Sequence, residues 1–212
     1  MSFAFQAIKN WQKFKRQFPW RKNPTPYTIM IAEFMLQRTR AEQVDPIYKK
    51  FLKQYPTIFH LAKAKSKSVS KYTSQLGLHW RYKHFISSAK YVVKNLNGKF
   101  PHTRKELTNI PGVGDYVGGA IAAVCFYNAD YVIDSNIARF INRYYNINLT
   151  GEIRRKKIII EKAKKLFRVK DQRKFLFAIL DFTALICKPK KPLCFECPIK
   201  KNCKYQNKTK PE

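Results

Sequence analysis

Residues 109–136 of the 212-residue chain read NIPGVGDYVGGAIAAVCFYNADYVIDSN, and the rest of the sequence is interpreted around this stretch. It begins with a glycine-rich turn at Gly112 and Gly114, continues through an apolar run at 120–127, and ends on a carboxylate, Asp134. This pattern predicts a helix, a hairpin turn, a second helix and a loop that delivers an acid to the start of another helix. Glycines allow backbone N–H groups to approach a phosphate closely, and the dipole of the following helix adds to the attraction. The hairpin is therefore a candidate for holding a DNA backbone without reading its bases.

Two plainer interpretations of these residues stay open on the sequence alone. An ordinary corner between two helices also uses glycine, and Gly112-Val113-Gly114 is a short motif. An aspartate directly before a helix is a common N-cap, so the position of Asp134 does not by itself make it catalytic.

The charge of the chain is the first indication of a partner. Forty-three Lys and Arg against 13 Asp and Glu give a net charge of +30, spread along most of the chain. Such a charge repels itself, so a polyanion is the natural partner, and nucleic acid is the first choice. A solvated lysine-rich surface, as in low-GC or thermophilic organisms, is the alternative. A hydrophobic content of 45% indicates a folded chain.

No segment of the sequence predicts a membrane partner. Spanning a bilayer takes about 20 consecutive apolar residues, and the longest apolar segment, 175–187, is interrupted by Asp181. The N-terminus lacks the features of a signal peptide. We therefore expect a monomer in the cytoplasm of a prokaryote, associated with the nucleoid.

The hydrophobic periodicity is helical throughout, and no convincing strand alternation occurs, so an all-α fold is predicted. Asp45-Pro46 is expected at or near a helix boundary, and 19–26 is expected to form a turn. A loose polar tail is expected after residue 203. The expected helices are 3–18, 27–39, 41–54, 58–64, 66–76, 80–95, 136–145, 152–167 and 173–186, with 103–107 leading into the hairpin.

Four of the five cysteines fall within 17 residues, at Cys187, Cys194, Cys197 and Cys203. In a reducing compartment this grouping favours a metal site over disulfides. Four thiolates can hold a [4Fe–4S] cluster. They can equally hold a structural Zn²⁺, and the spacing alone does not decide between the two.

Taken together, these motifs resemble the helix–hairpin–helix (HhH-GPD) DNA glycosylase superfamily. The resemblance rests on Ile110-Pro111-Gly112-Val113-Gly114, Val132-Ile133-Asp134-Ser135-Asn136 and Arg139, and it covers residues 18–203. It implies an all-α, two-domain endonuclease III-like fold with a DNA cleft between the domains. A six-helix barrel containing the hairpin would span 22–128, and 1–21 with 129–212 would form the cluster domain.

The resemblance also implies roles for individual residues. The spacing Cys187-x6-Cys194-x2-Cys197-x5-Cys203 matches the loop of the iron–sulfur members, which favours a [4Fe–4S] cluster with a structural, DNA-facing role. Asp134 matches the catalytic aspartate, and Glu33 aligns with the acidic residue of the mismatch-directed branches. Tyr116 stands where the strand-cleaving members carry a nucleophilic lysine. Without that amine no Schiff base forms, so weak or absent AP-lyase activity is expected. The expected DNA contacts are Gly112, Val113, Gly114, Gln37, Arg38, Asn136 and Arg139.

The mechanism that the resemblance implies begins with base flipping from a double-stranded DNA containing a mispair. Asp134 stays ionised and stabilises the oxocarbenium-like sugar as the glycosidic bond breaks. Glu33 protonates the departing base or orients water, a general acid–base role, and Tyr116 lines the pocket. The expected activity is thus that of a monofunctional glycosylase in base excision repair.

The identity of the base is less sharply indicated. The segments 142–145, 181–184 and 189–192 look most like archaeal-type thymine mismatch glycosylases, and the sequence stops nine residues after Cys203, without the further domain usual in adenine glycosylases. This favours thymine or uracil opposite guanine. Residues 34–37 and 76–81 resemble the adenine branch as much, so removal of adenine opposite guanine or 8-oxoguanine stays open. A non-catalytic iron–sulfur DNA-binding protein is the alternative of a different class.

Overall fold

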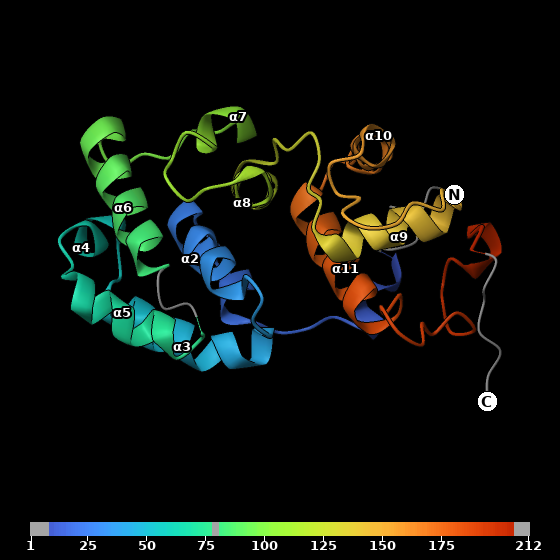
Figure 1. Cartoon of the computed structure of the whole chain (residues 1–212), viewed down its shortest axis with the longest axis horizontal. Coiled ribbons are helices and arrows are strands. Elements are labelled where there is room, and N and C mark those ends of the chain that lie inside the picture. Colours follow the sequence, from blue (N-terminus) through green and yellow to red (C-terminus); the bar gives the residue numbers. More distant parts are fainter. Residues whose placement is uncertain (1–8, 78–80, 206–212) are drawn as a thin grey trace. The chain divides into compact units, whose positions relative to one another are not determined.

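A computed structural model of the chain describes residues 9–77 and 81–205, and every regular element within those ranges is helical (Figure 1). The predicted all-α class is therefore confirmed. The chain forms two compact units. We call 17–128 the hairpin unit, and 1–16 with 129–212 the cysteine unit. No helix in the described ranges is both long enough and apolar enough to cross a membrane.

The hairpin unit is built around one helix that is buried on nearly every side. This helix, α2, packs against α3 and α8, while α6 packs against α4 and α5. Thr25 caps the start of α2 through a hydrogen bond from the Thr28 amide. Aromatic rings fill the space between the helices, with Phe34 edge-on to Phe85 at 5.2 Å between centroids. The elements are η2 (Pro19–Arg21), α2 (Pro26–Leu36), α3 (Ala41–Gln54), α4 (Ile58–Ala62), α5 (Ser66–Ser74), α6 (Tyr82–Leu96), α7 (Arg104–Leu107), α8 (Asp115–Ile121) and the π-helical turn η3 (Ala122–Phe126).

In the cysteine unit, α9 packs against both α10 and α11, and the short helix η1 packs against α11. Phe140 on α9 and Phe182 on α11 meet edge to face at 5.5 Å. The elements are η1 (Trp11–Lys13), α9 (Ser135–Tyr145), α10 (Lys157–Leu166), α11 (Gln172–Leu185) and η4 (Lys200–Asn202). The loop from 186 to 203, which carries the four cysteines, follows α11.

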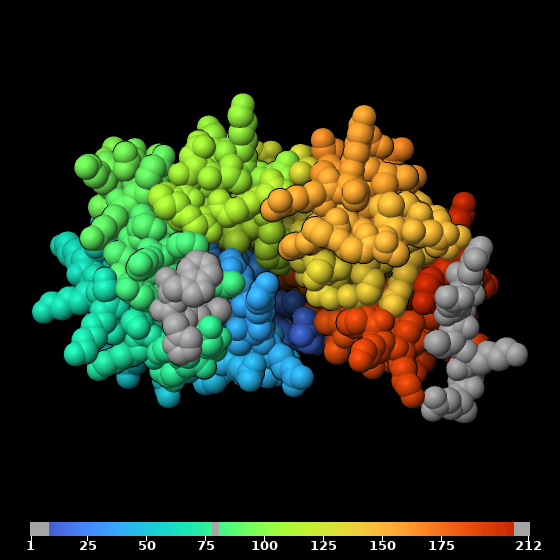
Figure 2. Space-filling model, in the orientation of Figure 1, coloured from blue at the N-terminus to red at the C-terminus, as the bar shows by residue number. Residues whose placement is uncertain are grey.

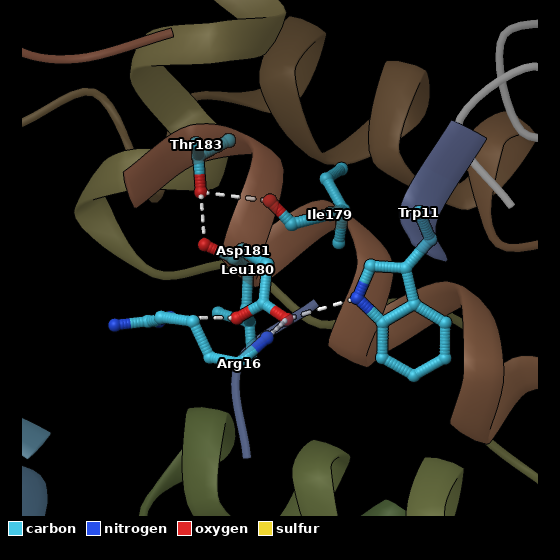
Figure 3. A network of polar contacts seen from close by, with 6 residues as sticks. All are labelled: Trp11, Arg16, Ile179, Leu180, Asp181 and Thr183. Atoms are coloured by element: carbon cyan, nitrogen blue, oxygen red, sulfur yellow. Dashed lines mark hydrogen bonds and ion pairs between the residues drawn. The ribbon is translucent and has the colours of Figure 1, made fainter. Parts of the chain in front are cut away.

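One buried carboxylate attaches the N-terminal segment to α11 (Figure 3). Asp181 has no exposed surface. It accepts hydrogen bonds from Trp11 Nε1 at 2.9 Å, Arg16 N at 3.1 Å and Arg16 Nε at 2.8 Å. Because a buried charge is tolerated only when it is paired and hydrogen-bonded, these contacts hold the segment from 11 to 16 in place.

The expected boundary at Asp45-Pro46 is wrong, because Pro46 lies inside α3. The helix has already begun, with the Val44 amide bonded to the Arg40 carbonyl. A proline in a helix interior removes one backbone hydrogen bond and costs about 3 kcal/mol. The apolar face of α3 offsets this cost by burying Val44, Tyr48 and Phe51 among others.

Several predicted helix ends differ from the structure. The helix expected from 152 begins at Lys157 instead, because Glu152 accepts hydrogen bonds from the backbone and side chain of Arg154 and closes a separate turn. The helix expected over 3–18 ends by Phe14. Its first residues, 3–8, lie outside the described residues, as does residue 80 at the expected start of α6. Smaller differences occur at the C-terminal ends of α2, α4 and α5.

Candidate functional site

The hairpin predicted from the sequence joins α7 to α8 in the hairpin unit. The Val113 amide bonds to the Ile110 carbonyl at 2.9 Å, and Val113 is buried while Gly112 and Gly114 are exposed. The Ser88 hydroxyl on α6 donates to the Pro111 carbonyl at 2.5 Å and so attaches the turn to α6. The hairpin thus presents exposed backbone, on a buried anchor, at the start of α8.

The two hairpin glycines differ in whether their backbone requires a glycine. Gly112 has φ +81, and a Cβ placed there would lie 2.8 Å from the Cβ of His84. Gly114 has φ −81, which any residue can adopt, and a Cβ there would meet no atom within 4 Å. The tight geometry expected at both positions is therefore confined to Gly112. The open space at Gly114 leaves room for an external backbone to approach.

Two candidate catalytic side chains belong to helices that pack together in the hairpin unit. Glu33 is half-buried on α2, between the buried residues Ala32 and Phe34. Tyr116 is the second residue of α8 and is also half-buried. Because α2 and α8 are in contact, the fold brings these two elements together, although they are more than 80 positions apart in the sequence.

Gln37 and Arg38 follow the C-terminal end of α2. Gln37 is its C-cap, and the Gln37 carbonyl accepts a weak hydrogen bond of 3.4 Å from Arg81. Arg38 is exposed and has φ +62, a conformation in which a non-glycine residue is uncommon. Burial lowers the pKa of Arg81, and the charge of Arg38 lowers it further. Two guanidinium groups therefore lie near each other at this helix end, where an anion would relieve their repulsion.

Asp134 is the N-cap of α9 in the cysteine unit. Its carboxylate accepts from the Ile137 amide at 2.6 Å and from Asn136 Nδ2 at 3.1 Å. Burial raises the pKa of Asp134, while these hydrogen bonds and the charge of Arg139 lower it. The capping interpretation is correct in the structure. It does not exclude chemistry, because a carboxylate held in place by two donors is also pre-oriented for a reacting sugar.

A chain of hydrogen bonds leads from Asp134 to the cysteine loop. Arg139 Nη1 donates to Asn136 Oδ1 at 2.7 Å, and the same Asn136 side chain donates to Asp134. Arg139 Nη2 donates to the carbonyls of Thr183 and Cys187, each at 2.9 Å. In this structure Asn136 and Arg139, both expected to contact DNA, use these side-chain groups to join α9, α11 and the first cysteine.

Arg143 lies one helical turn beyond Arg139 and holds the same loop, a role that the sequence reasoning missed. Its Nη1 donates to the Lys188 carbonyl at 2.6 Å and lies 3.7 Å from the Cys187 sulfur, and its Nη2 donates to the Pro189 carbonyl at 2.8 Å. The spacing of four residues between two arginines on one helix face was the available signal.

All four cysteines line one pocket, together with Phe140, Phe182 and Arg143 among others, and the pocket contains about 340 Å³ of empty space, part of it open to solvent. Burial raises the pKa of the Cys187 thiol, which Arg143 and Arg139 oppose, and burial raises the pKa of the Cys197 thiol to about 12. Within 9–77 and 81–205, no three His, Cys, Asp or Glu side chains are arranged to hold a single metal ion.

A family model for the HhH-GPD superfamily base excision DNA repair proteins matches residues 31–168, more than half of the chain. The chain belongs to this superfamily. The matched residues include the hairpin, Glu33, Tyr116 and Asp134, whereas the four cysteines lie beyond them. Iron–sulfur clusters are frequent in the endonuclease III-like members of the HhH-GPD superfamily.

This HhH-GPD protein is similar in sequence to both thymine/uracil and adenine DNA glycosylases, and similar in fold to solved glycosylase structures. It is 33% identical to the thymine/uracil-DNA glycosylase of Methanothermobacter thermautotrophicus, over 97% of this chain and 94% of that protein. It is also 33% identical to an adenine DNA glycosylase of Buchnera aphidicola, covering 94% of this chain but only 57% of that protein. A thermostable thymine-DNA glycosylase superposes with a TM-score of 0.90 at 33% identity, covering 98% of this chain and 96% of the other. An endonuclease III trapped on DNA superposes at 0.75 with 16% identity, over 95% of this chain and 92% of that one, which shows the shared fold.

The predicted site residues thus fall into two sets, one in each unit. The hairpin, Glu33, Tyr116, Gln37 and Arg38 belong to the hairpin unit, on α2, α8 and the turns beside them. In the cysteine unit, one hydrogen-bond network joins Asp134, Asn136 and Arg139 to the cysteine loop.

Proposed function

We propose that this HhH-GPD protein is a monofunctional DNA N-glycosylase that removes thymine or uracil opposite guanine from double-stranded DNA. The observation that carries the proposal is the 33% identity, over nearly the full length of both chains, to a thymine/uracil-DNA glycosylase. Tyr116, at the second position of α8, supplies no amine for a Schiff base. The products are therefore a free base and an uncut strand with an abasic site.

The proposed binding step uses the hairpin and the flipped nucleotide. The exposed backbone at Gly112 and Gly114 would bind a phosphate through its N–H groups, reinforced by the start of α8. Extruding the target base costs a few kcal/mol, and less at a mispair. A net charge of +30 supplies attraction to the duplex as a whole.

In the proposed chemical step, Asp134 in its ionised form stabilises the positive charge that develops on the sugar. The Ile137 amide and Asn136 hold its two oxygens, so that no reorganisation is needed as the charge appears. Glu33, on a helix buried nearly all round, protonates the departing base or orients the attacking water. Tyr116 contacts the extruded base.

The four cysteines of the shared pocket would hold a [4Fe–4S] cluster through their thiolates. When bound, the cluster supplies structural cross-linking of the loop rather than chemistry on the base. Equal amounts of iron and acid-labile sulfide, near four per chain, are expected in protein purified without oxygen. Stoichiometric zinc without iron would contradict this assignment.

Adenine is the second candidate base, because the adenine DNA glycosylase of Buchnera aphidicola is as identical to this chain as the thymine/uracil enzyme is. A single-turnover panel of duplexes containing T·G, U·G, A·G and A·8-oxoguanine separates the two. Strand breaks that appear only after alkali would distinguish a glycosylase from a lyase. If no base is released from any of the four duplexes, the proposed function is wrong.

The role of Asp134 has a matched control within the chain. Asp171 is also an aspartate N-cap, of α11, and accepts from the Lys174 amide at 2.9 Å. Asparagine caps helices about as well as aspartate, so D134N and D171N should both fold. Only D134N is expected to lose base release, by about 100-fold or more, while keeping its affinity for duplex. Equal rates of base release in D134N and D171N would show that Asp134 takes no part in the chemical step.

A further inference from the structure

The stretch that carries the hairpin differs in charge from the rest of the chain. No Lys or Arg occurs in residues 106–138, although the whole chain has 43 of them. The same stretch contains four of the 13 acidic residues, Glu106, Asp115, Asp130 and Asp134. A DNA phosphate that reaches the hairpin therefore meets backbone amides and carboxylates, but no basic side chain from this part of the sequence.

Asp115 is the acidic residue next to the hairpin. It directly follows Gly114 as the first residue of α8, and its side chain is 68% exposed. A carboxylate in this position opposes the binding of a phosphate by the exposed backbone at Gly112 and Gly114, because like charges placed side by side repel each other. The proposed phosphate contact therefore requires that the charge of Asp115 be neutralised.

The neutralising charge comes from Arg104, the first residue of α7. Its Nη1 donates to Asp115 Oδ1 at 2.7 Å, and its side chain is 18% exposed. Close packing of α7 on α8 keeps the arginine there, since a Cβ at Gly118 would lie 3.3 Å from the Arg104 carbonyl oxygen. The lime-green surface around α7 is exposed at the upper edge of Figure 2. Arg104 and Asp115 are thus already paired, beside the hairpin, in the protein without DNA.

We propose that Arg104 is required for DNA binding through Asp115: its charge neutralises this carboxylate, so that the hairpin can bind a phosphate. The inference rests on the proposed function, because it takes the hairpin as the phosphate contact. A partly exposed ion pair adds little to folding stability, so the pair acts in binding. The basic residues elsewhere in the chain attract the duplex as a whole, whereas Arg104 determines whether the hairpin can hold it at close range.

Two single variants separate this role from a structural one. R104M and D115N both break the pair, so a merely structural role predicts that both weaken DNA binding. The charge argument predicts opposite signs. R104M leaves Asp115 without its partner and should weaken binding by about tenfold at low salt, while D115N should tighten binding. R104M/D115N removes both charges and should bind with nearly the wild-type affinity.

Binding is measured on a duplex that carries a tetrahydrofuran analogue of an abasic site. This analogue has no base, so neither base identity nor base release affects the result. The loss in R104M should shrink as the salt concentration rises, because ions screen the repulsion. The Arg154–Glu152 pair in the cysteine unit is the matched control, since its arginine also donates to a carboxylate. R154M and E152Q should change the affinity much less than R104M and D115N do.

A scan with single neutral methylphosphonate linkages locates the contact. At the phosphate that the hairpin binds, wild type and R104M should bind equally, because no charge is left for Asp115 to repel. The inference is wrong if R104M and D115N shift the affinity in the same direction, if the control pair gives shifts of the same size, or if the R104M loss is equal at every linkage. These outcomes do not depend on base release, whereas the proposed function fails if the wild-type protein releases no base from any mispair.

Discussion

The contact between Asp181 and the N-terminal segment makes the most quantitative prediction about stability. In D181N the side chain keeps its size, but one oxygen becomes an NH₂ group that faces N–H donors from Trp11 and Arg16. Breaking a buried ion pair by removing one partner costs about 3–5 kcal/mol. Because Arg16 is 26% exposed, its guanidinium recovers part of its hydration. We therefore expect a loss of about 3 kcal/mol in the free energy of unfolding, which lowers Tm by roughly 10 °C in a chain of this size.

Urea unfolding followed by circular dichroism measures this loss, with T183V as the matched control. Thr183 is equally buried on the same helix, but its hydroxyl donates only to carbonyls of its own helix, those of Ile179 and Leu180 (Figure 3). Removing it should cost about 1 kcal/mol. A loss below 1 kcal/mol in D181N, or losses of equal size in the two variants, would refute the reasoning that this carboxylate attaches the N-terminal segment.

Three further predictions concern the site. G112A should lower the free energy of unfolding by about 1–2 kcal/mol, because alanine is strained at φ +81 and its Cβ meets His84. G114A should unfold like the wild type in urea, but it should bind duplex more weakly if a phosphate approaches there. Equal stabilities of G112A and G114A would contradict the geometry of the two glycines. Because burial raises the pKa of Asp134, the acid limb of base release should lie above the ordinary aspartate value of about 3.9. Because its pKa is raised in the folded state, Asp134 contributes fully to stability below its unfolded-state pKa, and this contribution is lost as pH rises through its folded-state pKa. An acid limb of the single-turnover rate at or below about pH 3.9 would count against a buried carboxylate. R139M should lose about 2–3 kcal/mol in thermal unfolding, since it leaves the carbonyls of Thr183 and Cys187 without their donor; an unchanged Tm would show that water replaces it.

The amino-acid sequence by itself determined the features that depend on a few neighbouring residues. The all-α class followed from periodicity, and the hairpin followed from Gly112, whose positive φ is a property of the backbone at that position. The N-cap at Asp134 and the spacing of the cysteines are likewise local. Pro46 misled the boundary prediction because the burial of one helix face outweighed a local preference.

Only the tertiary structure decided which side chains meet across elements. Trp11 and Asp181 bond to each other although they are 170 positions apart, and Arg139 and Arg143 reach Cys187 from a helix more than 40 positions away. Such contacts depend on the angle and depth at which helices pack, which arise from the sum of many weak apolar contacts, and no motif in the sequence records that sum.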